Sequence, residues 1–133
     1  MKLQIIIMIR LLKKYKIDYN KPTSLMLGRW QPWHAGHQAL FEQSLTKTGQ
    51  VIIMVRDTPR DDSNPFTFLQ VKDKIEEALS NYAGRFEVIK VPNITNICYG
   101  RGVGYKIEEI VLPEQIQKIS ATKIREEINA RKS

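Results

Sequence analysis

Two histidines stand three residues apart in the stretch Gly28-Arg-Trp-Gln-Pro-Trp-His34-Ala-Gly-His37, and they are the only histidines in the chain. At a helix start, that spacing places both imidazoles on one face of the first turn. The unpaired N–H groups and the positive end of the dipole at such a turn attract an anion. Gly28 permits a tight turn, and we expect Gly36 to let a phosphate approach the backbone. With Arg29 nearby, the pattern predicts a site for a phosphate chain.

Zinc binding is the competing interpretation of a histidine pair. The single cysteine, Cys98, is remote in sequence, and the chain has no HExxH pattern. Structural zinc sites use four such ligands, often arranged in recognisable spacings. The phosphate interpretation is therefore favoured over a metal site, and no side-chain metal ligands are expected.

The elements that must position these residues alternate between strand and helix. Apolar or β-branched runs predict strands at residues 24–27, 51–55, 86–91, 94–99 and 107–112. Helical spacing and end signals predict helices at about residues 33–47, from 64–67 to about 82, and from Ser120 onward. This alternation predicts an α/β fold: a mostly parallel sheet of about five strands flanked by helices. Ligands of such sheets bind beyond the carboxyl ends of the strands.

Length and composition fit one globular domain. The chain has 133 residues, of which 42% are apolar and 26% charged. We expect an N-terminal extension over residues 1–20 and the folded domain over residues 21–133. No run of about 18 apolar residues is present, so no membrane span is expected. A single cysteine excludes an internal disulfide framework, and the cytoplasm is the expected compartment.

The net charge of +7 favours anionic partners, without distinguishing nucleotides, phosphorylated metabolites, nucleic acid or lipid. The apolar residues 3–12 are expected to pack on the domain or on a neighbouring copy. A solvated basic surface explains the charge equally well.

A second candidate anion site is Ile119-Ser-Ala-Thr-Lys-Ile-Arg125. Ser120 and Thr122 stand at the predicted helix start, where hydroxyl and N–H groups bind phosphate. Arg125, one turn later, can reach the same anion with its forked guanidinium. Taken alone, the segment fits an N-capped surface helix with an ordinary arginine. The anion-site interpretation is favoured because the same chain carries the histidine motif.

Three segments resemble the HxGH nucleotidyltransferase superfamily, whose members are cytidylyltransferase-like. GRWQPWHAGH is similar to the GRFQPxHxGH form of archaeal-type nicotinamide mononucleotide adenylyltransferases, and ISATKIR resembles their ISxTxxR motif. Asn64-Pro-Phe-Thr67 resembles the NPFT segment of the same group. The resemblance covers about residues 23–130 and implies a Rossmann-like sheet that binds a nucleotide across its middle.

The resemblance implies transfer of a nucleoside monophosphate, AMP from ATP, onto a phosphorylated small molecule, with release of pyrophosphate and with Mg²⁺ bound to the triphosphate. His34, His37 and Arg125 would be the catalytic residues. The implied nucleotide-binding residues are Gly28, Arg29, Trp30, Gly36, Ser120 and Thr122. The alternatives are a CTP-dependent cytidylyltransferase and a non-catalytic nucleotide- or nucleic-acid-binding module, of which nucleic acid is not favoured. Relatives commonly self-associate, so a homo-oligomer is expected.

The acceptor site has less specific candidates. The resemblance and the positions after strands point to Arg56, Asn64, Tyr99 and Arg101, with Tyr105 beside them. Arg56 and Arg60 instead fit a polar loop whose arginines pair with its aspartates, which is the slightly favoured interpretation. Trp30 and Trp33 fit a wall of the pocket better than a base-stacking platform.

Overall fold

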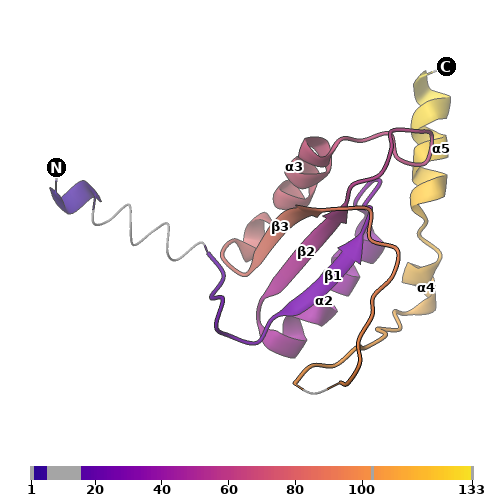
Figure 1. The fold of residues 1–133 in the computed structure, drawn as a ribbon. Helices are drawn as coiled ribbons and strands as arrows, with labels where there is room; N and C mark the ends of the chain where they lie inside the picture. Colours follow the sequence, from indigo (N-terminus) through magenta and orange to yellow (C-terminus); the bar gives the residue numbers. More distant parts are fainter. Residues whose placement is uncertain (1, 6–15, 103, 133) are drawn as a thin grey trace.

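The computed structural model describes residues 2–5, 16–102 and 104–132. Three parallel strands form one sheet in the order β1-β2-β3: β1 (Ser24–Gly28), β2 (Val51–Arg56) and β3 (Phe86–Val91). Helix α2 (Ala35–Thr48) connects β1 to β2, and α3 (Phe68–Ala78), followed by the short 3₁₀ turn η1 (Ser80–Tyr82), connects β2 to β3. Figure 1 shows α2 and α3 behind the sheet. The predicted α/β fold with a parallel sheet is confirmed.

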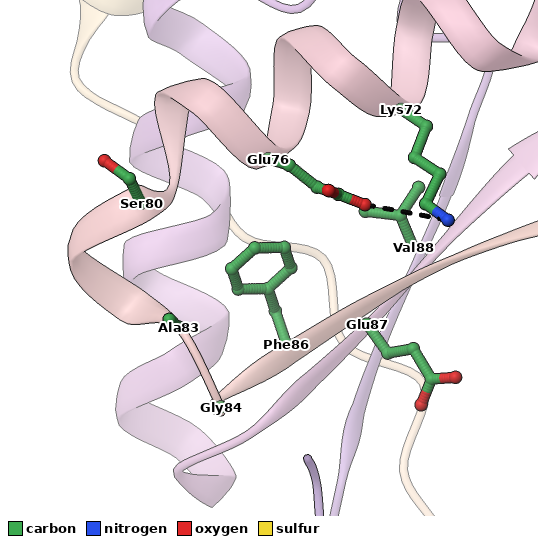
Figure 2. A pocket seen from close by; sticks show the side chains of 8 residues that line it. All are labelled: Lys72, Glu76, Ser80, Ala83, Gly84, Phe86, Glu87 and Val88. Carbon is green, nitrogen blue, oxygen red and sulfur yellow. Dashed lines mark ion pairs between the residues drawn. The ribbon is translucent and has the colours of Figure 1, made fainter. Parts of the chain in front are cut away.

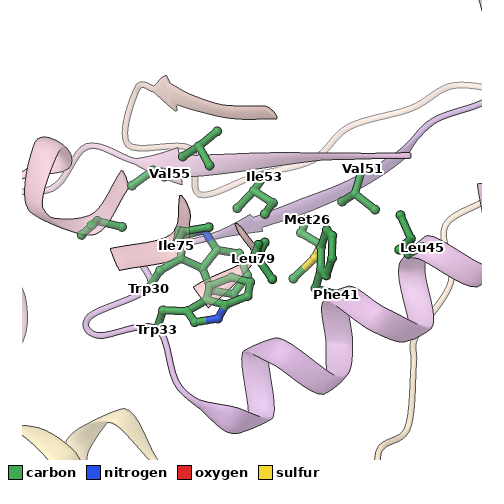
Figure 3. Packing of buried hydrophobic residues seen from close by; sticks show 12 residues of the cluster. Met26, Trp30, Trp33, Phe41, Leu45, Val51, Ile53, Val55, Ile75 and Leu79 are labelled. Carbon is green, nitrogen blue, oxygen red and sulfur yellow. The ribbon is translucent and has the colours of Figure 1, made fainter. Parts of the chain in front are cut away.

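The core lies between one face of the sheet and these two helices (Figure 3). Alternate residues of the central strand, Val51, Ile53 and Val55, are almost fully buried because successive strand residues point to opposite faces. The cluster is completed from β1, β3, the β1–α2 turn, α2, α3 and the residue after α3: Met26, Val88, Trp30, Trp33, Phe41, Leu45, Val71, Ile75 and Leu79. Both tryptophans that precede α2 therefore belong to the core, which ties the histidine turn to the rigid part of the fold.

The predicted end of α2 and the predicted start of α3 are also confirmed, whereas α3 ends at Ala78 and not near residue 82. Gly49 follows α2 in the left-handed conformation with φ 89°, and its N–H donates to Leu45 O. Thr67 and Gln70 form the expected capping box at the start of α3. Short-range signals of this kind depend on few residues, so sequence alone locates them.

The fourth and fifth predicted strands, residues 94–99 and 107–112, are wrong: neither segment is in a strand. The side-chain hydrogen bonds of these segments are local instead: Thr95 Oγ1–H donates to Asn96 Oδ1 at 2.6 Å, and Gln117 Nε2–H donates to Leu112 O at 2.6 Å. Several apolar side chains of this segment stay exposed: Ile97, Tyr99, Ile107 and Val111. The sheet consequently has three strands where about five were expected, and the segment runs past β1 toward the other end of the sheet (Figure 1).

Two more helices follow this segment: α4 (Glu114–Gln117), which was not predicted, and α5 (Ala121–Lys132). The N–H of Lys123 donates to Ser120 Oγ at 3.2 Å, so Ser120 caps α5 as expected. α5 lies beyond the β1 side of the sheet (Figure 1), and α4 packs against α2.

The chain before β1 is attached to the amino end of β2 through Gln50, which is 7% exposed. Its side chain accepts from Asp18 N at 2.9 Å and donates to Asp18 O at 2.6 Å and to Thr23 Oγ1 at 2.7 Å. The expected interface at residues 3–12 lies mostly outside the described residues, since residues 6–15 are not among them. Within the described ranges, none of the helices has the length and apolar character needed to cross a bilayer.

Candidate active site

The two histidines cap the helix that they begin. His34 Nδ1 accepts from Gly36 N at 3.0 Å and from His37 N at 3.4 Å, while His37 Nδ1 accepts from His34 N at 3.2 Å. This is a reciprocal capping box made of two imidazoles. Because each Nδ1 is an acceptor, the proton of each neutral ring is assigned to Nε2. Both histidines therefore present an Nε2–H donor.

Aromatic neighbours surround the histidine pair. The two imidazoles stack with ring centroids 3.6 Å apart, and His37 also lies 4.8 Å from Trp30 and 5.4 Å from Trp33. Burial lowers the pKa of His34. Burial, followed by the effect of His34, lowers the pKa of His37 to about 3. Both rings are neutral near pH 7, so they act on an anion as hydrogen-bond donors and not as positive charges.

Two glycines are needed for reasons that differ from the sequence expectation. A Cβ on Gly36 would lie 2.8 Å from His34 Cε1, so the imidazole fills the space that we expected a phosphate to use. A Cβ on Gly28 would lie 2.8 Å from atoms of the Trp30 indole. Trp30 has φ 55°, and its Nε1–H donates to Met54 O at 3.0 Å. Both glycines thus make room for a neighbouring ring.

A pocket of about 240 Å³ opens at the carboxyl ends of β1 and β2, next to the start of α5. Its lining residues are Gly28, Arg29, Trp30, Gln31, His37, Arg56, Ala121 and Arg125. The structure therefore brings the predicted residues His37 and Arg125 to one cavity, although they are far apart in sequence. Four other predicted residues do not line the pocket but adjoin residues that do. The His34 ring stacks on His37, Gly36 precedes His37 in the sequence, and Ser120 and Thr122 flank Ala121 in the sequence.

The pocket is positively charged. Among the described residues, no carboxylate lies within ion-pair distance of Arg29, Arg56 or Arg125. Neutral acceptors hold all three guanidinium groups instead, as Arg56 Nη2 donating to Asn93 Oδ1 at 3.0 Å illustrates. Among the described residues, the expected ion pairs of the loop arginines with aspartates are not present, and the three cations line a pocket whose lining includes no carboxylate.

Arg125 is held by two protein acceptors. Its Nη1 donates to Gln31 O at 2.6 Å, and its Nη2 donates to Thr122 Oγ1 at 3.3 Å. Thr122 therefore orients the arginine in addition to standing at the helix start. A guanidinium has five N–H donors, so these two bonds leave others for an anion in the pocket.

Asn64 is 6% exposed and does not line the pocket. Its Oδ1 accepts from Arg29 Nη1 at 3.1 Å, and its Nδ2–H donates to Asp61 Oδ1 at 2.9 Å. Hydrogen bonds from Asn64 and from backbone N–H groups, with the nearby Arg29 charge, lower the pKa of Asp61. Asn64 therefore orients Arg29 in this structure, and its predicted contact with the acceptor stays a prediction.

Tyr99 and Arg101, the other acceptor candidates, are not brought to the pocket. They belong to the irregular segment that leaves β3, and Figure 1 shows this segment reaching the end of the sheet opposite to α5. The ion pair between Glu108 and Lys47, 3.6 Å long, attaches the same segment to the last turn of α2, at the amino end of the sheet. Because no fourth strand returns toward the site, these residues are carried away from it.

A larger pocket of about 390 Å³ lies between α3 and the amino end of β3 (Figure 2). Its lining includes the ion pair Lys72–Glu76, with 3.7 Å between Nζ and Oε1, together with Phe86, Glu87 and Val88. It contains no histidine or arginine, and it is at the opposite end of the strands from the motifs. The smaller pocket is the candidate active site because it has the anion-binding chemistry.

Sequence reasoning missed two lining residues, Gln31 and Ala121. Ala121 stands between the predicted residues Ser120 and Thr122, and it lines the pocket as the first residue of α5. Gln31 lies inside the recognised motif, but its partners are far along the chain, so no local signal reveals its role.

The three motifs resemble those of the HxGH nucleotidyltransferase superfamily, and comparisons with known proteins support this resemblance, although no family model matches the chain. A nicotinamide-nucleotide adenylyltransferase of Methanococcus aeolicus is 30% identical over 73 residues, which are 53% of this chain and 42% of the relative. The crystal structure of NadR protein in complex with NAD and AMP-PNP matches with a TM-score of 0.51 and 16% identity, over 68% of this chain and 25% of that one. The chain thus spans less than half the length of either protein, and the NadR match shows the fold alone.

Proposed function

We propose that the protein is a nucleotidyltransferase that moves a nucleoside monophosphate, AMP from ATP, onto a phosphorylated small molecule and releases pyrophosphate. The observation that carries the proposal is the pocket shared by His37 and Arg125, between the starts of two helices. A polyphosphate in this pocket would meet neutral N–H donors on one side and a guanidinium on the other. This is the donor set that transfer at a phosphorus centre requires.

In the proposed reaction, an oxygen of the acceptor phosphate attacks the α-phosphorus in line, and the bond from that phosphorus to the β-phosphate oxygen breaks. The Nε2–H groups of His34 and His37 donate to α-phosphate oxygens, where negative charge crowds in the transition state. Arg125 and the N-terminal end of α5 receive the β- and γ-phosphates and then the pyrophosphate. A phosphate nucleophile is already ionised near pH 7, so the weakly basic His37 need not remove a proton.

Mg²⁺ is proposed to arrive with the triphosphate. The lining of the pocket offers arginines and an imidazole and no carboxylate, whereas Mg²⁺ prefers oxygen ligands. Phosphate oxygens and water would therefore supply the ligands. Bound in this way, the ion shields the charge of the leaving pyrophosphate, and the protein's own part is to hold the phosphates in line.

The choice of ATP over CTP is supported by the curated relative, which is a nicotinamide-nucleotide adenylyltransferase. The acceptor is proposed only as a class, a phosphomonoester, because Arg56 and Arg29 supply two further cations at the β1–β2 side of the pocket.

The test is pyrophosphate release from ATP and, separately, from CTP, against a panel of phosphorylated acceptors that includes nicotinamide mononucleotide. We expect release with ATP and one acceptor, and a loss of about 10²–10³ in kcat for His37→Ala. Lys74→Ala, on the exposed surface of α3 and outside the pocket, is the matched control and should keep full activity. Nucleotide binding without turnover for any acceptor would contradict the proposal and favour a binding module; tight nucleic-acid binding that falls steeply with salt would favour the nucleic-acid alternative.

A further inference from the structure

Gln31 is a buried polar residue that contacts two other parts of the site. It is 4% exposed. Its side chain faces the segment that precedes α3, and its backbone carbonyl faces α5. We infer that Gln31 is a positioning residue for Arg125: its amide fixes the β1–α2 turn so that its carbonyl can hold the guanidinium toward the phosphates. This inference rests on the proposed function.

The side chain of Gln31 pairs with both backbone groups of a single residue, Phe66. Its Nε2–H donates to Phe66 O at 3.0 Å, and its Oε1 accepts from Phe66 N at 2.9 Å. Two opposed bonds between an amide and the backbone fix both the distance and the orientation of the side chain. Arg29, two residues earlier, reaches the same segment through Asn64 at 3.1 Å. The turn is therefore anchored to the NPFT segment at two points.

The backbone carbonyl of Gln31 connects the β1–α2 turn to Arg125 on α5. It accepts from Arg125 Nη1 at 2.6 Å, between residues that are 94 positions apart in sequence. A hydrogen bond from a charged donor is stronger than one between neutral groups. With the bond from Nη2 to Thr122, it holds the guanidinium in one orientation at the edge of the pocket.

Loss of the amide would leave the N–H and C=O of Phe66 without their partner, and the turn would lose one of its two anchors. The carbonyl of residue 31 would then no longer be held toward Arg125. The residue acts on the site through the arginine, so the effect should fall on binding of the β- and γ-phosphates and not on binding of the acceptor.

The test uses Gln31→Met, which keeps the length of the side chain and removes both bonds. Gln70→Met is the matched control, because Gln70 makes the same kind of bond at the neighbouring residue, accepting from Thr67 N at 2.8 Å, without touching Arg125. The measurements are the affinity for inorganic tripolyphosphate and the separate KM values for ATP and acceptor. We expect Gln31→Met to weaken tripolyphosphate binding and raise KM for ATP about tenfold, with KM for the acceptor unchanged, and Gln70→Met to change neither.

A double-mutant cycle separates positioning from a general structural effect. In an Arg125→Ala background, Gln31→Met should weaken tripolyphosphate binding less than about twofold further. Equal effects with and without the arginine, or equal effects of Gln31→Met and Gln70→Met, would overturn the inference. Gln31→Asn, which keeps the amide one methylene shorter, should give a partial loss and serves as the test if Gln31→Met does not fold. A wild-type protein that binds no tripolyphosphate and releases no pyrophosphate refutes the proposed function itself, and the role of Gln31 with it.

Discussion

Replacing Gly36 by alanine should separate the activity of the protein from its stability. The added Cβ would lie 2.8 Å from His34 Cε1 and 3.1 Å from His34 Nδ1. Contacts that short are not tolerated, so the imidazole must swing away from the helix end. It then loses the two N–H bonds that it accepts and its stacking on His37.

The expected change in the free energy of unfolding is small because two effects oppose each other. Loss of an N-cap costs about 1 kcal/mol. Alanine in place of glycine within a helix returns up to about 1 kcal/mol. The net change should therefore stay within about 1 kcal/mol, while the displaced donor lowers kcat by about 10²-fold.

The assays are thermal unfolding, pyrophosphate release at saturating substrates, and the ¹⁵N resonances of the imidazoles, which report tautomer and pKa. In Gly36→Ala the pKa of His34 should rise toward its ordinary value as the ring becomes solvated. Gly49→Ala is the control: that glycine has φ 89° with open space around its Cβ position, so the substitution should cost about 1 kcal/mol and leave kcat unchanged. A Gly36→Ala protein with wild-type turnover and an unshifted His34 resonance would refute the reasoning.

Three further predictions concern the same site. First, burial lowers the pKa of His37 from 6.5 to about 3, so below pH 6.5 the unfolded state binds a proton that the folded state does not. The free energy of unfolding should therefore fall by about 2 kcal/mol between pH 7 and pH 5. Denaturant titration should show that the free energy of unfolding of His37→Gln depends less steeply on pH. Second, Arg125→Lys should lose the forked geometry and raise KM for ATP at least tenfold in steady-state kinetics, and an unchanged KM would remove the arginine from the phosphate site. Third, Gly28→Ala places a Cβ 2.8 Å from the Trp30 indole and should destabilise the fold by about 1–3 kcal/mol, seen as a lower Tm with altered tryptophan fluorescence; an unchanged Tm would mean that the indole can move freely.

Sequence reasoning located the parts of the fold that depend on neighbouring residues. The strands at Val51–Arg56 and Phe86–Val91, the glycine after α2 and the Thr67–Gln70 capping box were predictable because each signal lies within a few positions. It failed at residues 94–99 and 107–112, whose β-branched residues indicate strand propensity. A strand also needs a partner edge, and these segments make local hydrogen bonds instead, such as the one that Thr95 Oγ1–H donates to Asn96 Oδ1.

The candidate site was likewise predictable only in part. The motifs predicted that His37 and Arg125 belong to one function, and the pocket that they line is compatible with this prediction. The roles of Gln31 and Asn64 were not predictable, because each depends on a partner that only the folded chain brings near. The packing of the His34 ring over Gly36 was also hidden, since a rotamer is not encoded in spacing.

We propose that two imidazoles at the start of α2 and the guanidinium of Arg125 bind one polyphosphate. The most direct test is to titrate AMP-PNP into ¹⁵N-labelled protein and follow the Nε2–H resonances of the two histidines together with Nε–H of Arg125. We expect all three resonances to shift along one binding curve with a single Kd, and inorganic tripolyphosphate to compete with AMP-PNP for the same site. A titration in which the arginine signal moves while the imidazole signals stay fixed, or the reverse, would contradict the proposal.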